Sequence, residues 1–436
     1  MTPAAITVAF DQDLLRRRLE DAWRRSDRIF DLLDPAAFYR RPIALRQPFL
    51  FYVGHLPAFG WNQVLGGLLG RESPQPEFDQ LFARGIDPVG VDRYEPDRPD
   101  AWPTIAQTLA YRDRVRSALR SAVAEVGARA GSDVLAGHGR VLHLVLEHEL
   151  MHHETLLYMA QQLDRSLVRR PGYLPSYRFD GAPSPGRRAV PGAQVTLGAS
   201  FDRVPFGWDN EFPESLHEVL PFQMDRTPVR NSEWLAFMRA GGYERPELWT
   251  ADGWAWKERT GHRSPVFWRN VCGAWRYLTL FDDLPIDQVA DWPVYVSWAE
   301  ADAYARWSGG MLPSEAEFHR AADGVRWGDP ATGNFDFQQW APEPVGRNPD
   351  GESVFGVRDL VGNGWEWTRS VFAPFPGFTA WARTYPGYSA DFFDGSHYVM
   401  LGASWATDRA LVRRSLRNWF QPHYPYVFAK FRCVYR

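Results

Sequence analysis

Residues 146–154 read LEHELMHHE and lie inside a longer stretch, residues 133–163, whose apolar residues recur at helical spacing. Each residue of an α-helix advances by about 100°, so His148 and His152 fall about 40° apart on one stripe. The other members of this stripe are Val141, Leu144, Val145, Thr155 and Met159. An apolar stripe that carries two histidines faces a bundle interior, where helical proteins build metal sites.

Three other segments carry the same helical periodicity, at residues 11–33, 47–69 and 103–128. Four long helices predict a four-helix bundle, which we assign to residues 1–165. Between residues 166 and 194 the composition becomes rich in Pro, Gly and Arg, which is typical of a linker or a wrapping strap.

Residues 195–436 are dominated by Trp, Gly, Pro and short apolar pieces, which indicates an irregular α+β domain with much loop. Helices are expected there only at residues 231–240, 297–307 and 314–322.

The bulk composition narrows the classes of partner. The formal net charge of the 436 residues is -4, and no basic run is interleaved with aromatic residues, so we expect no nucleic-acid partner. No run of about 18 uncharged apolar residues occurs, and the N-terminus becomes charged too early for a signal peptide, so we expect a cytoplasmic protein without a membrane partner. Two cysteines fit a reducing compartment, and 20 Trp suggest aromatic-lined cavities.

A third metal ligand has to come from another helix. His55 is apolar on both sides in FLFYVGHLPAFGWN and is the candidate, since three neutral imidazoles leave positions open for a catalytic metal. His153 lies about 100° away from His152, and Glu154 points about 200° away, so neither can share the same ion. Glu149 is expected to be a surface or supporting carboxylate.

Two alternatives compete with this metal site. A buried histidine can be an ordinary hydrogen-bonded core residue. The pattern H-E-x-x-H at residues 148–152 also occurs in zinc proteases, but those enzymes need a further ligand downstream, and the sequence HETLLYMAQQLDRS that follows His152 offers no suitable one.

Four motifs in the second half carry a family resemblance: MLPSEAEFHRAA (311–322), GVRDLVGNGWEWT (356–368), YVMLGASWATD (398–408) and RRSLRNWFQPHYPYVFAKFRCV (413–434). They resemble the signatures of the formylglycine-generating-enzyme (sulfatase-modifying factor) fold, a C-type-lectin-like domain. The first half, with His55 and H-x3-H-x-E at 148–154, resembles the DinB-type bundle. Together they resemble the ergothioneine-pathway sulfoxide synthases over almost the whole chain.

The resemblance implies a mononuclear non-haem Fe(II) held by His55, His148 and His152, O2 as oxidant, and hercynine as a substrate. The implied reaction joins a sulfur or selenium nucleophile to C2 of the hercynine imidazole, with the reactants held side by side on the metal. In the loop GFTAWARTYPGYSADFF, it implies a proton- or electron-donor role for Tyr385 and places Tyr388 beside it.

The resemblance also assigns substrate contacts. Asn418 and Trp419 match positions that contact the betaine, where an aromatic face suits a quaternary ammonium, and Phe420 can add to that face. Relatives that use γ-glutamylcysteine have an Asp and an Arg where this chain has Phe420 and Tyr424, and a Gln where it has Met151. A less charged, more aromatic site favours the selenoneine synthase branch, which couples a selenosugar to hercynine.

Three other functions remain as alternatives. The first is an ergothioneine-type sulfoxide synthase that uses cysteine or γ-glutamylcysteine. The second is a copper-dependent formylglycine-generating oxidase, which needs a pair of nearby cysteines where this chain has only Cys433. The third is a non-catalytic lectin-like binding protein. We expect Glu315, Glu317 and Glu366 to satisfy backbone groups of the fold.

Overall fold

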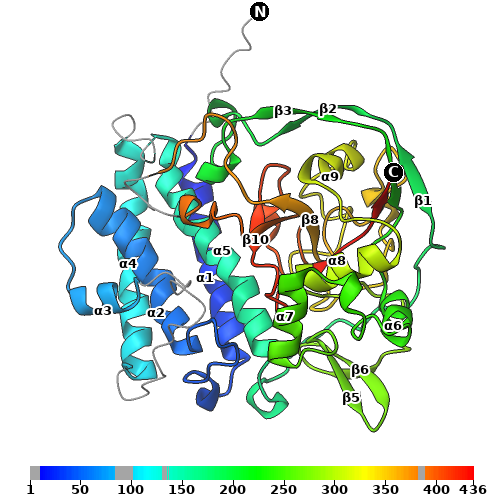
Figure 1. Ribbon diagram of the computed structural model, residues 1–436. Coiled ribbons are helices and arrows are strands. Elements are labelled where there is room, and N and C mark those ends of the chain that lie inside the picture. Colours follow the sequence, from blue (N-terminus) through cyan, green and yellow to red (C-terminus); the bar gives the residue numbers. More distant parts are fainter. Residues whose placement is uncertain (1–9, 84–101, 130–134, 136, 382–387) are drawn as a thin grey trace, which may run out of the picture. The chain divides into compact units, whose positions relative to one another are not determined.

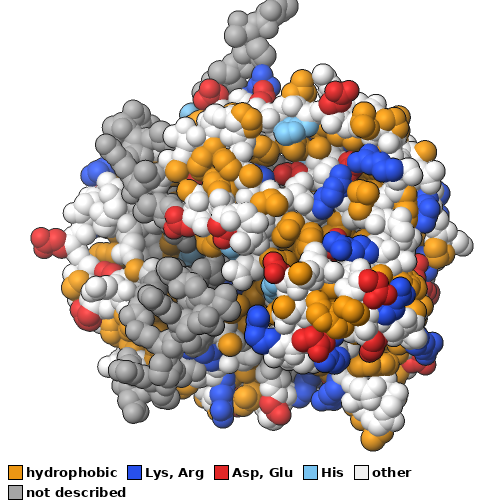
Figure 2. Space-filling view, in the orientation of Figure 1, with side chains coloured by type: hydrophobic (Ala, Val, Ile, Leu, Met, Phe, Trp, Pro, Cys, Tyr) orange, Lys and Arg blue, Asp and Glu red, His pale blue; other side chains and the backbone are white. Residues whose placement is uncertain are grey.

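The computed structural model describes residues 10–83, 102–129, 135, 137–381 and 388–436 (Figure 1). The chain divides into two compact units: unit 1 is Met1–Pro171 with Asp202–Phe206, and unit 2 is Gly172–Phe201 with Gly207–Arg436. Within the described residues, no helix combines the length and apolar character that a membrane crossing requires. On the face shown in Figure 2, acidic and basic side chains are interspersed with apolar ones.

Unit 1 is helical (Figure 1). Its helices are α1 (Gln12–Asp31), α2 (Phe49–Gly60), α3 (Pro76–Leu81), α4 (Ile105–Ala128) and α5 (Arg140–Gln161), and the π-helical segment Trp61–Leu68 continues α2. Helix α1 packs against α5, and α2 packs against α4. The four helices expected from apolar periodicity are confirmed as α1, α2 with its continuation, α4 and α5. The short helix α3 was not predicted.

Local sequence explains where these helices begin and how they pack. The Asp11 carboxylate caps α1 by accepting from the Leu14 amide at 2.8 Å, and Thr104 with Gln107 forms a capping box at the start of α4. Helix α2 is apolar all round, and each of its residues is buried. Gly60 allows close packing here, since a Cβ would lie 2.6 Å from the Leu119 side chain on α4, which would have to shift.

Unit 2 combines small sheets with helices. Its strands are β1 (Arg187–Val190), β2 (Ala193–Leu197), β3 (Ser215–Val219), β4 (Phe222–Asp225), β5 (Trp268–Val271), β6 (Ala274–Leu278), β7 (Asp283–Pro285), β8 (Trp365–Val371), β9 (Tyr398–Leu401), β10 (Asn418–Phe420), β11 (Ala429–Lys430) and β12 (Val434–Tyr435). The sheet orders are β1-β4-β12, β10-β9-β8-β11, β2-β3 and β5-β6-β7. Its helices are α6 (Asn231–Arg239), α7 (Ala251–Thr260), α8 (Trp298–Trp307) and α9 (Glu315–Ala321).

The expected helices at 231–240, 297–307 and 314–322 are confirmed as α6, α8 and α9, so this half is a mixture of helices and strands. Helix α7 was missed, because its apolar residues are few and its sequence is rich in Trp and charge. The segment 166–194, expected to be a linker or strap, contains β1 and the start of β2. Strand β1 exists because it pairs antiparallel with β4, a distant partner that local composition does not reveal.

The three glutamates of the motifs were expected to satisfy backbone groups, but an arginine partners each of them. Glu366 is fully buried and forms a two-point ion pair with Arg432, at 2.6 and 2.8 Å. Glu317 accepts from the Ser314 amide at 2.7 Å, which caps α9, and Glu315 pairs with Arg417 at 2.9 Å. Only Glu317 therefore satisfies a backbone group in the predicted manner.

Candidate metal centre and aromatic sites

Helices α2 and α5 bring three histidines of unit 1 together. His55 comes from α2, whereas His148 and His152 stand one turn apart on α5. Their side chains are buried, with 4%, 5% and 7% of their surface exposed. One ligand atom from each of the three lies within 4.8 Å of the others, which is close enough for one ion to bind all three.

The donor atoms suit a shared ion. His148 Nε2 and His152 Nε2 lie 3.2 Å apart. Two nitrogens at that separation, each about 2.1 Å from one ion, subtend an angle of about 99°, which lies between octahedral and tetrahedral values. His55 Nδ1 donates to the Phe82 carbonyl at 2.7 Å, because a carbonyl can only accept. This bond fixes the tautomer and leaves the lone pair of His55 on Nε2, as metal binding requires.

Burial keeps all three imidazoles neutral. It lowers the pKa of His55 to about 4, against a smaller opposing effect of the Phe82 hydrogen bond. Burial also holds the pKa values of His148 and His152 well below the ordinary range, and the neighbouring histidines lower them further. At neutral pH the cluster therefore offers three lone pairs instead of three bound protons, which is the state that a divalent cation binds.

Aromatic rings enclose the cluster. Phe59 stacks on the His148 ring with centroids 3.6 Å apart and planes 8° apart, and Phe51 stacks on His55 at 4.9 Å. Among the described residues, no hydrogen-bond partner reaches Nδ1 of His148 or of His152. Of the three histidines, His55 alone therefore makes, within the described residues, the outer hydrogen bond that metal-binding histidines usually make.

Two other polar residues of α5, His153 and Glu149, contact Ser26 on α1. His153 Nε2 lies 2.8 Å from Ser26 Oγ on α1, and the same hydroxyl donates to Glu149 at 2.5 Å. Arg116 on α4 approaches Glu149 at 3.5 Å. Glu149 is only 2% exposed, so it is a buried supporting carboxylate. Burial raises the pKa of Glu149, and Arg116 opposes that effect. Glu154 is also buried, and Met151, beside His152, is half-buried.

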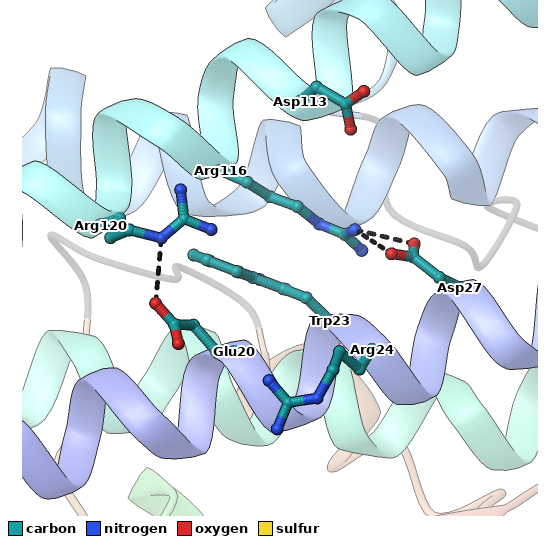
Figure 3. Close-up of a pocket in the computed structure, with 7 residues that line it drawn as sticks. All are labelled: Glu20, Trp23, Arg24, Asp27, Asp113, Arg116 and Arg120. Atoms are coloured by element: carbon teal, nitrogen blue, oxygen red, sulfur yellow. Dashed lines mark hydrogen bonds and ion pairs between the residues drawn. The ribbon is translucent and has the colours of Figure 1, made fainter.

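A groove between α1 and α4 offers a second concave surface in unit 1 (Figure 3). It is lined by Glu20, Trp23, Arg24, Asp27, Asp113, Arg116 and Arg120. The guanidinium groups of Arg116 and Arg120 each lie 5.6 Å from the centroid of the Trp23 ring. Arg116 binds both oxygens of Asp27, at 2.7 and 2.9 Å, and Arg120 binds Glu20 at 3.0 Å. None of the three clustered histidines lines this groove. Its other two charged residues pair with residues outside it, Arg24 with Asp21 and Asp113 with Arg112.

In unit 2, the predicted catalytic tyrosines divide between described and undescribed residues. Tyr385 lies outside the described residues. The Tyr388 ring stacks on Trp208 at 4.1 Å and meets the ring of Trp419 edge-on at 5.3 Å. Trp419 also stacks on Phe372, with centroids 4.1 Å apart and planes 7° apart. Two of the predicted residues, Tyr388 and Trp419, thus belong to one aromatic cluster.

The other predicted substrate contacts flank this cluster. Asn418, Trp419 and Phe420 form β10, which pairs with β9 at one edge of the four-stranded sheet. Phe420 stacks on Tyr424 with centroids 5.1 Å apart and planes 9° apart. Tyr424 is 4% exposed, whereas Phe420 is partly exposed. The two aromatic replacements noted in the sequence are therefore in direct contact.

Sequence reasoning missed a polar group beside the aromatic cluster. Ser389, next to Tyr388, donates its hydroxyl to Asp209 and accepts from Asn210 Nδ2 at 3.0 Å. Burial raises the pKa of Asp209, partly offset by the Ser389 bond. Ser389 lies 179 residues after Asn210 and 180 after Asp209, and no motif connects it to them. Ser389 opens the S-x-x-F-F motif, which is the one signal that pointed to it.

Comparison with known proteins agrees with the two units. Residues 180–436 match the sulfatase-modifying factor enzyme 1-like domain, and residues 18–156 match the DinB superfamily. The chain is 32% identical over 450 residues to the hercynine oxygenase of Mycolicibacterium thermoresistibile, covering 97% of this chain and 94% of the relative. It is 34% identical over 413 residues to the hercynine oxygenase of Mycobacterium tuberculosis, covering 90% and 91%.

A fungal relative is longer. The chain is 29% identical over 499 residues to ergothioneine biosynthesis protein 1 of Neurospora crassa, covering 92% of this chain and 55% of the relative. It thus spans about half of the fungal protein and nearly all of the two mycobacterial proteins. The chain therefore belongs to the family of oxidoreductase-type enzymes, built from a DinB domain and a sulfatase-modifying-factor-type domain, that includes the hercynine oxygenases and ergothioneine biosynthesis protein 1.

Proposed function

We propose that the protein is a non-haem iron(II), O2-dependent enzyme that couples a selenosugar to C2 of the hercynine imidazole and so makes selenoneine. The cluster of His55, His148 and His152 is the observation that carries this proposal. The names of the mycobacterial relatives support hercynine as a substrate. Replacing the C2–H and Se–H bonds by a C–Se bond releases two protons and two electrons. O2 takes up these and two further electrons from selenium, so that one oxygen atom ends in water and the other in a selenoxide. Cleavage of the bond between selenium and the sugar would then be needed to give selenoneine.

The three histidines would hold the metal. When bound, ferrous iron supplies open coordination positions at which O2 and a selenolate or thiolate are activated together. The chain's contribution is to keep His55, His148 and His152 neutral and to surround them with aromatic rings. A neutral ligand set leaves the full charge of the cation available to an anionic nucleophile.

The aromatic cluster of unit 2 would bind hercynine. The trimethylammonium group of hercynine is a permanent cation, and the faces of Trp419 and Tyr388 attract such a group through cation-π interactions. Asn418 lies next in the chain and adds a polar side chain for the betaine carboxylate. Tyr385 would donate the proton, a role that rests on the family motif alone.

The contact between Phe420 and Tyr424 supports an uncharged nucleophile. A γ-glutamyl group carries an ammonium and a carboxylate, and both would lose hydration beside two stacked rings without finding charged partners. A sugar ring presents an apolar face to such rings. Met151, half-buried on α5, is a further uncharged side chain beside a proposed ligand, His152.

An ergothioneine-type sulfoxide synthase is the second candidate, with cysteine or γ-glutamylcysteine as nucleophile. The name of the fungal relative, ergothioneine biosynthesis protein 1, favours it. A copper-dependent oxidase has less support, because the two cysteines differ in setting: Cys272 is exposed and Cys433 is buried.

The deciding experiment incubates Fe(II)-loaded protein with hercynine, O2 and, in separate reactions, a selenosugar, its thiosugar analogue, cysteine and γ-glutamylcysteine. Mass spectrometry then identifies the products. A selenosugar adduct is expected, and product from γ-glutamylcysteine alone would refute the interpretation of Phe420 and Tyr424. Absence of iron uptake would instead support a non-catalytic lectin-like binding protein.

A matched pair of variants tests the proton donor. Tyr385→Phe removes only the phenol and is expected to slow coupling or to divert the enzyme toward oxidation of the nucleophile. Tyr388→Phe keeps the ring that stacks on Trp208 and is expected to retain most coupling activity. Unchanged coupling in Tyr385→Phe would remove the role assigned to that residue.

A further inference from the structure

The three candidate ligands reach the cluster in two different ways. His148 and His152 belong to one helix, so the backbone of α5 sets their spacing without outside help. His55 belongs to α2, and its distance from the pair depends on tertiary packing. Something other than local helical geometry must therefore fix the orientation of the His55 ring.

The Phe82 carbonyl is the hydrogen-bond partner that contributes to this, beside the Phe51 ring that stacks on His55. It accepts from His55 Nδ1 at 2.7 Å, which turns Nε2 toward the other two histidines. Phe82 directly follows helix α3, so the position of α3 sets the position of this carbonyl. The contacts of α3 and the packing of the Phe82 side chain together decide where this carbonyl lies.

Two side-chain hydrogen bonds attach α3 to its surroundings. The Tyr111 hydroxyl on α4 donates to Asp79 Oδ1 at 2.5 Å, and Asn62 Nδ2 in the π-helical segment donates to the Asp79 carbonyl at 3.3 Å. Asp79 is 7% exposed and Tyr111 is 2% exposed. A buried carboxylate that loses its donor is costly, so this contact fixes α3 firmly. Burial and the Asp79 charge both raise the pKa of Tyr111, which therefore remains a donor.

Packing leaves Phe82 little room to move. Its ring is fully buried and lies near Phe78, at 5.7 Å, and near Tyr111, at 6.0 Å. On the side of α2 it presses against Gly54, where an added Cβ would lie 2.4 Å from the ring. A small movement of α3 therefore displaces the Phe82 carbonyl, because the ring cannot compensate by sliding along α2.

We propose that Tyr111 and Asp79 are positioning residues for the metal centre: their hydrogen bond holds α3 so that the Phe82 carbonyl aims the His55 imidazole at the metal. This inference rests on the proposed metal site. It assigns a functional task to α3, a helix that contributes no ligand to the histidine cluster. Losing an outer hydrogen bond of this kind lowers metal affinity by about 10- to 100-fold in other metal sites.

The test compares metal affinity in Tyr111→Phe, Asp79→Asn and wild-type full-length protein. Co(II) is the probe, followed by its visible absorption and by competition with a chelator. Tyr111→Phe is expected to weaken Co(II) binding about 10- to 100-fold and to change the absorption band. Asp79→Asn keeps an acceptor for the Tyr111 hydroxyl and is expected to stay within about threefold of wild type.

A matched control separates positioning from stability. Tyr177→Phe removes a tyrosine hydroxyl that donates to Asp282 at 2.7 Å in unit 2, so it makes the same chemical change in the unit without the three histidines. It is expected to leave Co(II) affinity unchanged even if it lowers the melting temperature. A purely structural role for Tyr111 predicts the same result for Tyr111→Phe.

The outcomes distinguish the two proposals. Wild-type protein that binds no Co(II) overturns both the metal site and this inference. Wild-type protein that binds Co(II), together with unchanged affinity and absorption in Tyr111→Phe, overturns this inference alone. If Tyr111→Phe does not fold, Asn62→Ala decides: it removes the second tether of α3, so weaker Co(II) binding supports the inference and unchanged binding overturns it.

Discussion

His152 and His153 are adjacent in the chain, yet their side chains face different neighbours. His152 Nε2 lies 3.2 Å from His148 Nε2, whereas His153 Nε2 lies 2.8 Å from Ser26 Oγ. Replacing each of the two by leucine, which cannot bind a metal, therefore separates metal binding from helix packing. We expect His152→Leu to abolish tight Co(II) binding and His153→Leu to preserve it.

The two substitutions are expected to change the free energy of unfolding for different reasons and by different amounts. His153→Leu removes the buried hydrogen bonds of His153 to Ser26 and to the Ala22 backbone, which cost about 1 kcal/mol of unfolding free energy each, while Ser26 keeps its bond to Glu149. Metal at about 100 times its dissociation constant stabilises the folded state by about 2.7 kcal/mol. In a domain of this size, that gain raises the melting temperature by about 5–11 °C.

Far-UV circular dichroism follows the helices of unit 1 during melting, with and without Co(II). Wild type and His153→Leu are expected to show the same metal-dependent rise from different starting temperatures, and His152→Leu is expected to show none. A rise that persists in His152→Leu, or that disappears in His153→Leu, would show that the metal is bound elsewhere on α5.

Three further outcomes are expected. Arg116→Met leaves the buried Glu149 carboxylate without its cation and should cost about 3–5 kcal/mol in urea unfolding, whereas Arg120→Met breaks a half-exposed pair and should cost less than about 1 kcal/mol. Burial lowers the pKa of His319 to about 3 from 6.5. The contribution of the neutral imidazole to the free energy of unfolding is therefore fully present above pH 6.5 and is lost as the pH falls toward 3. His319→Gln should reduce the slope of unfolding free energy against pH in this range by up to about 1.4 kcal/mol per pH unit, as measured by denaturant unfolding at a series of acid pH values. If Trp419 supplies the proposed cation-π face, Trp419→Leu should weaken hercynine binding about fivefold in calorimetry.

The candidate ligands were predictable because two of them carry a local signal. The spacing of His148 and His152 is a property of the helix itself, so a sequence of nine residues already encodes their shared direction. His55 was found by its apolar surroundings, since a histidine flanked by Phe, Val and Leu has little access to water. Their approach to within 4.8 Å of one another depends on helix packing, which only the structure reveals.

The supporting groups were not predictable, and the reason is physical. The acceptor for His55 is a main-chain carbonyl, which every residue possesses, so the sequence cannot distinguish Phe82 from its neighbours. Asp79 and Tyr111 are 32 residues apart and belong to no motif. Likewise, β1 forms through pairing with β4, and the composition of residues 187–190 suggests loop instead. Long-range partners decide these features, whereas local periodicity decides the helices.

The division of the ligands between two helices makes metal binding and folding depend on each other. A pair at i and i+4 survives as long as α5 remains helical, but the third ligand requires α2 to stay packed beside it. By thermodynamic linkage, the free energy that His55 adds to metal binding also stabilises the packing of α2 against α5 when the metal is bound. Loosening unit 1 without unfolding α5 should turn a three-histidine site into a two-histidine site. The hydrogen bond between Tyr111 and Asp79 holds α3, and through the Phe82 carbonyl it acts on His55, the ligand that depends on tertiary packing. In this proposal, a helix that contributes no ligand therefore affects the affinity for the metal.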